Sequence, residues 1–172
     1  MTSYLSSTIS TLLKYKVVAE KAFEQLTEEQ LFWKPDPESN SIGIIVNHLA
    51  GIMISRWTNF LTEDGEKSWR NRENEFKDEI SSRALLLERW NAGWKCFLET
   101  LNSLTDNDLE RTVYIRNEAH TVMEAIQRQL AHYALHVGQI IFLGKMQKGI
   151  DWSSLSIPKG ESESFNQTMF EK

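Results

Sequence analysis

The sequence has few of the residues that interrupt helices or cross-link chains. It contains three prolines, eight glycines and one cysteine, Cys96, in 172 residues. A single cysteine excludes a disulfide within the chain and indicates a reducing compartment, so we expect the protein in the cytoplasm. Cys96 lies in the apolar run WKCFLETL, which favours a buried and unreactive thiol over a nucleophile.

The chain also lacks a surplus of positive charge and long apolar runs. Its formal net charge is −5, so it cannot neutralise many phosphates, and we expect no nucleic acid as the main partner. No apolar run reaches the roughly 18 residues of a membrane span. The N-terminal segment MTSYLSSTISTLLKYK has no basic start followed by an apolar core, which argues against a signal peptide. We therefore expect no membrane contact.

What the chain does have is long amphipathic segments. Apolar residues recur at spacings of three and four, which predicts four helices over about 4–26, 42–61, 80–104 and 121–147. Gly65 is expected to stop the second helix, and the fourth ends before Gly149. The third has an inner stripe that consists of Leu86, Trp90, Trp94, Phe97, Leu101 and Leu104. Four such helices predict an all-α protein, a four-helix bundle.

The stretches between these helices are long. KPDPESN is predicted to be a loop, and RTVYI at 111–115 alternates like a short β-strand or extended arm. Residues 151–172 are polar and lack a helical period, so we expect a tail that packs on the bundle or extends from it. The bundle itself is assigned to residues 1–150.

Three histidines lie on faces that their neighbours mark as apolar. In AHYALHVGQ, His132 and His136 are four residues apart and leave the same side of a helix, and His48 lies in IIVNHLAGIMISRW. Three neutral imidazoles with an open fourth position are typical of a catalytic zinc site, and nickel, iron or manganese can use the same ligands. The alternative interpretation is three core histidines that each bond a backbone carbonyl.

These motifs resemble a known family. NHLAG, followed on a later helix by HYALHVGQI, resembles the DinB/YfiT-like superfamily of metal-binding four-helix bundles, and SRWTNFLTEDGEKSWRNRENEF at 55–76 resembles one poorly characterised bacterial branch of it. The resemblance covers almost the whole chain. It implies that His48, His132 and His136 hold one divalent metal ion per chain, with zinc and nickel as the leading candidates. Members with assigned activity include thiol transferases, isomerases and hydrolases.

Several polar residues surround the expected site. Gln139 lies on the face of the two histidines and is expected either to orient a metal-bound water or bond a histidine's other nitrogen, or to be a helix-packing amide. Arg56, Trp57, Trp69 and Arg70 belong to a cluster of basic and aromatic residues mixed with acidic ones. This cluster indicates either a salt-bridged cap over one end of the bundle or a pocket for an anionic substrate.

The expected function is a metal-dependent enzyme that acts on a small-molecule substrate. The resemblance favours a thiol S-transferase or a hydrolase, with a low-molecular-weight thiol as one candidate substrate. The alternative is a non-catalytic, stress-related protein in which the metal is structural or regulatory. We also expect a homodimer, because six tryptophans are many for this length and Trp57 and Trp69 could line a contact.

Overall fold

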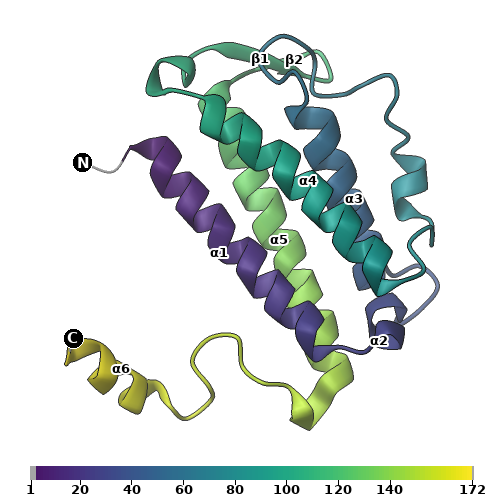
Figure 1. The fold of residues 1–172 in the computed structure, drawn as a ribbon, viewed down its shortest axis with the longest axis vertical. Coiled ribbons are helices and arrows are strands. Elements are labelled where there is room, and N and C mark those ends of the chain that lie inside the picture. Colours follow the sequence, from purple (N-terminus) through teal and green to yellow (C-terminus); the bar gives the residue numbers. More distant parts are fainter. Residues whose placement is uncertain (1–2, 172) are drawn as a thin grey trace.

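Four long helices lie side by side in Figure 1. They are α1 (Tyr4–Gln25), α3 (Ile42–Trp57), α4 (Arg83–Ser103) and α5 (Val122–Lys148), in a computed structural model that describes residues 3–171. α1 and α5 run in one direction, and α3 and α4 run in the other. α3 packs mainly on α4, and α1 packs mainly on α5. The expected all-α four-helix bundle is confirmed.

Each long helix begins after a hydroxyl residue that accepts a hydrogen bond from the helix's first turn. Ser3, Ser41, Ser82 and Thr121 bond the backbone N–H three residues further along. Thr121 and Glu124 form a reciprocal capping box. The expected start of the third helix at residue 80 is therefore too early, because Ser82 is its cap.

The second helix ends four residues before the expected position. α3 stops at Trp57, and Asn59 adopts a positive φ of 51°, which breaks the helical path. Gly65 is thus not the helix stop: it lies in the following segment, where its N–H donates to the Tyr114 carbonyl over 2.8 Å. None of the helices within 3–171 is both long and apolar enough to cross a membrane.

The short elements include a β-hairpin at one end of the bundle (Figure 1). The expected strand at 111–115 is β1 (Thr112–Ile115), and it pairs antiparallel with β2 (Glu118–Thr121), which the sequence pattern does not predict. The turn residues Arg116 and Asn117 both have positive φ, 56° and 62°, as the type I′ turn of two-residue hairpins requires. The Asp64 carboxylate accepts both of their backbone N–H groups, at 2.8 and 2.7 Å. Side-chain capping therefore holds a turn that contains no glycine.

The remaining short elements lie in the connections and the tail. They are α2 (Glu28–Phe32), η1 (Glu73–Phe76), η2 (Asp106–Asp108), η3 (Gly149–Asp151) and α6 (Ser162–Phe170). In the tail, Ser153 exchanges two hydrogen bonds with Gln25 at the end of α1. The side chains of α6 are all exposed, and the sequence pattern does not predict this helix.

The core lies between the long helices and is rich in aromatic residues. The expected inner stripe of the third helix is buried along its whole length. Trp57 packs between Phe60 and Phe97, and its indole N–H donates to the Tyr133 hydroxyl over 3.3 Å. Gly93 of α4 lies against Ala50 of α3, where an added Cβ would come 2.9 Å from the Ala50 Cα. The α3–α4 contact therefore depends on a residue without a side chain.

Two glycine substitutions test this packing. Gly93→Ala forces α3 and α4 apart, so we expect it to lower the free energy of unfolding by about 1–3 kcal/mol. Gly138→Ala is the matched control within α5: its Cβ meets nothing within 4 Å. It should raise the free energy of unfolding by about 0.5–1 kcal/mol through helix propensity alone. Urea denaturation measures both, and an equal effect of the two would contradict the close α3–α4 contact.

Candidate metal centre

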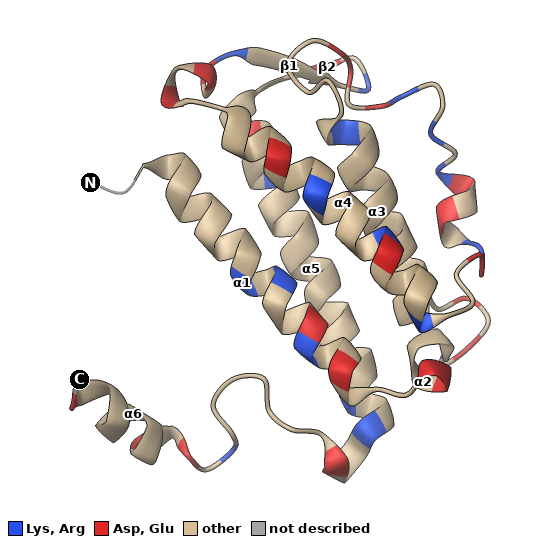
Figure 2. Ribbon diagram, in the orientation of Figure 1, with Lys and Arg blue, Asp and Glu red and all other residues tan. Residues whose placement is uncertain are grey.

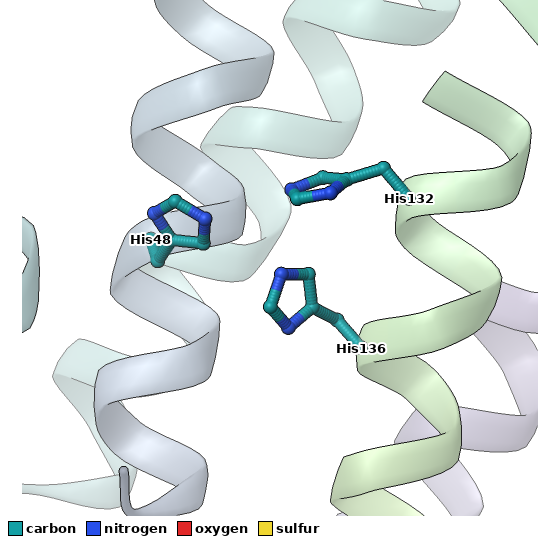
Figure 3. Close-up of side chains that lie close together, drawn as sticks. All are labelled: His48, His132 and His136. Carbon is teal, nitrogen blue, oxygen red and sulfur yellow. The ribbon is translucent and has the colours of Figure 1, made fainter. Parts of the chain in front are cut away.

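Three histidine rings from two helices face one another (Figure 3). His48 comes from α3, and His132 and His136 come from successive turns of α5. The ring centroids are 5.6 Å apart for His48–His132, 5.2 Å for His48–His136 and 4.5 Å for His132–His136. One ligand atom from each ring lies within 4.8 Å of the other two, so the three side chains could hold one metal ion.

A buried carboxylate fixes the ring of His48. The Nδ1 of His48 lies 2.9 Å from Oε2 of Glu75, which belongs to η1. Arg70 donates two hydrogen bonds to the same carboxylate, from Nε to Oε1 at 2.7 Å and from Nη2 to Oε2 at 2.9 Å. Burial alone would raise the pKa of Glu75, but the hydrogen bonds from His48 and Arg70 bring it below its ordinary value. Glu75 is therefore a carboxylate, and it leaves Nε2 of His48 free.

The NHLAG motif explains how Glu75 reaches this position. A Cβ at Gly51 would lie 2.2 Å from Oε1 of Glu75, so only glycine leaves room for the carboxylate against α3. Asn47 donates from Nδ2 to the backbone oxygen of Glu75, at 3.4 Å. Phe76 covers the imidazole of His48, with ring centroids 4.6 Å apart. Three positions of the motif thus contact η1.

The two histidines of α5 differ in their partners. Nδ1 of His136 lies 2.7 Å from Oε1 of Gln139, which leaves Nε2 free, as in His48. Nε2 of His132 is buried and has no hydrogen-bond partner among the described residues. Burial and the neighbouring His136 lower the pKa of His132 to about 4, and burial lowers that of His136. Both rings are therefore neutral at neutral pH, the form that binds metals.

The histidine cluster borders a pocket of about 410 Å³. His48, His132, Arg56 and Arg70 are among its lining residues. Trp57 is not, because its side chain is 1% exposed and packs in the core. Trp57 therefore lies outside this pocket, and its burial leaves little of its side chain accessible to a substrate or to a second chain. Trp69 is 59% exposed and remains free for such a contact.

The donor set fits a divalent transition metal. It consists of three imidazoles, which suit zinc, nickel and iron, and one of them carries a buried nitrogen without a partner among the described residues. Partners such as Glu75 and Gln139 on the opposite ring nitrogens are the usual way in which proteins orient ligating histidines. The buried nitrogen of His132 argues against three core histidines that each bond a backbone carbonyl.

Glu75 is the site residue that the sequence pattern does not single out. It lies 27 residues after His48 in the connection from α3 to α4, a segment of mixed charges at the right of Figure 2. The expected salt-bridged cap exists in part, because Arg70 pairs with both Glu66 and Glu75. The spacing of Arg70 and Glu75, five residues apart outside any long helix, gives no periodic signal.

The fold and the site define a four-helix bundle with a three-histidine cluster between two of its helices. Comparison with known protein families assigns the chain to one of them. A family model described as "Protein of unknown function (DUF1572)" matches residues 1–161, so the chain belongs to this family. No curated protein matches the chain.

The hydrogen bonds of the cluster predict which ring nitrogens carry protons. In the metal-free protein at neutral to mildly alkaline pH, His48 and His136 should both be protonated at Nδ1, because Glu75 and Gln139 accept there. Glu75→Ala should move the His48 proton to Nε2 and leave His136 unchanged, and Gln139→Ala should do the reverse. Long-range ¹H–¹⁵N NMR measures the tautomers. An Nε2-protonated His48 in the unsubstituted protein would contradict the assignment.

Proposed function

We propose that the protein is a metal-dependent enzyme of the DinB-like superfamily, which acts on a small molecule as a thiol S-transferase or a hydrolase. His48, His132 and His136 would hold one divalent ion, with zinc and nickel as the leading candidates. The observation that carries the proposal is the meeting of three imidazoles beside a pocket large enough for a small molecule. Family membership alone supports no activity.

The residues around the cluster have separable roles in this proposal. Glu75 and Gln139 hold the rings of His48 and His136 with Nε2 toward the centre. Arg70 keeps Glu75 ionised and in place. A divalent ion in such a site lowers the pKa of a bound thiol or water and so supplies an anionic nucleophile near neutral pH.

The composition of the pocket favours a nucleophile that is already acidic. None of the described residues that line it is an aspartate or a glutamate, and its titratable lining residues are histidines and arginines. The pocket therefore offers no carboxylate as a general base. A thiol requires less help than water to lose its proton, which makes the transferase the leading form of the proposal.

A structural metal is the second candidate. The cluster joins α3 to α5, two helices that contact each other less than α3 contacts α4. An ion there would cross-link the two halves of the bundle without any chemistry. Removal of a structural ion should lower the melting temperature strongly, whereas removal from a catalytic site should abolish substrate binding and leave the fold.

Metal content tests the ligand assignment. We expect about one divalent ion per chain, and His132→Ala should weaken metal affinity by at least about tenfold, since it removes one of three ligands. His120→Ala is the matched control, because His120 is the fourth histidine and lies outside the cluster. Elemental analysis and calorimetric titration measure both. Full occupancy in a variant that lacks all three cluster histidines would overturn the assignment.

Cobalt substitution tests the proposed reaction class. If the substrate is a thiol, small thiols should add a saturable sulfur-to-cobalt charge-transfer band to the absorption spectrum, because nitrogen and oxygen ligands give none. A matched set of alcohols is the control for nonspecific changes. An unchanged spectrum with every thiol would eliminate the transferase and leave the hydrolase or the structural ion.

A further inference from the structure

Positive charge is concentrated in the pocket beside the histidines. Its lining includes Arg56, Arg70, Arg72, Arg116 and Arg128. The chain as a whole carries a net charge of −5, so this concentration is local. Such a lining favours the binding of anions.

Arg56 differs from the other four arginines. Each of the others has a nitrogen within 4.0 Å of a carboxylate oxygen, from Glu66, Glu73, Glu75 or Glu118. Within residues 3–171, Arg56 has no such pair, and its Nε is buried without a hydrogen-bond partner. Its side chain is nevertheless withdrawn from water, with the residue only 6% exposed. A buried charge without a partner is costly for a protein to maintain.

The fold holds Arg56 in this position. It lies in the last turn of α3, and its stem passes Gly65, where an added Cβ would come 3.2 Å from Cγ and 3.3 Å from Nε. The hydrogen bond from Gly65 to Tyr114 fixes that segment to the hairpin. Burial lowers the pKa of the guanidinium, the positive charges of Arg128 and Arg70 lower it further, and Tyr133 and Glu66 act in the opposite direction. Arg56 therefore has no direct ion-pair partner among the described residues that would offset its burial.

Unpartnered polar atoms gather in the same pocket. Five buried side-chain nitrogen or oxygen atoms have no hydrogen-bond partner in the described part of the chain, and three of them belong to lining residues. These three are Nε of Arg56, Oε1 of Gln129 and Nε2 of His132. Native proteins leave few such atoms, and several in one pocket indicate a missing ligand.

We propose that this pocket binds a small molecule through its carboxylate or phosphate group, with Arg56 as the buried contact and Arg116 and Arg128 at the rim. A guanidinium presents parallel N–H donors that match both anions. Oε1 of Gln129 accepts an N–H or O–H of the same molecule. This inference rests on the proposed function in one respect: it names the class of substrate placed beside the histidines.

Anion titration of the metal-free protein tests this site. Calorimetry with inorganic phosphate, and separately with succinate, at an ionic strength matched with sodium chloride should show saturable binding of at least one anion. Binding of one but not the other decides between the phosphate and the carboxylate. Arg56→Met should weaken it by at least about tenfold, the effect of one lost charged hydrogen bond.

The matched controls separate the site from general charge. Arg89→Ala removes one exposed positive charge from α4, outside the pocket, and should change affinity less than twofold. Arg116→Ala and Arg128→Ala alter half-exposed side chains, so they should fold normally and weaken binding. They decide the question if Arg56→Met does not fold.

Thermal melting adds a readout that distinguishes a ligand contact from a structural role. Without anion, Arg56→Met should melt no lower than the unsubstituted protein, because it removes an unpaired buried charge. At an anion concentration near the Kd of the unsubstituted protein, that protein and Arg89→Ala should gain melting temperature, and Arg56→Met should gain much less. Unchanged affinity in Arg56→Met, or no binding beyond that of sodium chloride, would overturn the inference.

The two proposals can fail separately. Anion binding is measured without metal, so a protein that binds phosphate but retains no divalent ion contradicts the proposed function and supports the anion site. A protein that binds one divalent ion at the histidines and no anion supports the proposed metal site and contradicts the anion site.

Discussion

The hydrogen bond between His48 and Glu75 is the interaction on which the rest of the site depends. It joins a ring on α3 to a carboxylate of η1, in the connection that leads from α3 to α4. Arg70 holds the carboxylate from the other side, and Gly51 provides the space for it. Loss of one partner from such a buried charged set typically costs about 3–5 kcal/mol, because the remaining charge is left uncompensated. The same contact both orients a histidine and positions one wall of the pocket.

The bundle explains why the cluster lies where it does. Its tightest long-helix contacts are within the α3–α4 pair and the α1–α5 pair, and the histidines lie between one helix of each pair. Close packing within a pair uses residues such as Gly93 and Ala50, which leave no free volume. Between the pairs, α3 and α5 approach less closely, so polar side chains and a pocket find room there.

The arginines near the cluster serve two physical purposes. Arg70 is neutralised by carboxylates and holds the architecture of the site. Arg56 is also withdrawn from water but has no such partner among the described residues, so no carboxylate offsets the cost of burying its charge. Residues retained at a cost to stability are expected at sites of function. In the two proposals, metal affinity and anion affinity belong to adjacent but separable groups.

The sequence by itself determined the four long helices and the histidine faces. Periods of three and four fixed the inner stripe from Leu86 to Leu104, and the four-residue spacing placed His132 and His136 on one side of α5. It could not reveal Glu75 or β2, because the segments around them have no periodic pattern, and it could not reveal the unpaired state of Arg56, because pairing depends on tertiary contacts. Their roles depend on contacts between residues far apart in the chain, such as Asp64 with the hairpin turn and Glu75 with His48. Only the tertiary structure decided which charged residues of the segment 55–76 pair with each other. It also decided that Arg56 has no ion-pair partner among the described residues.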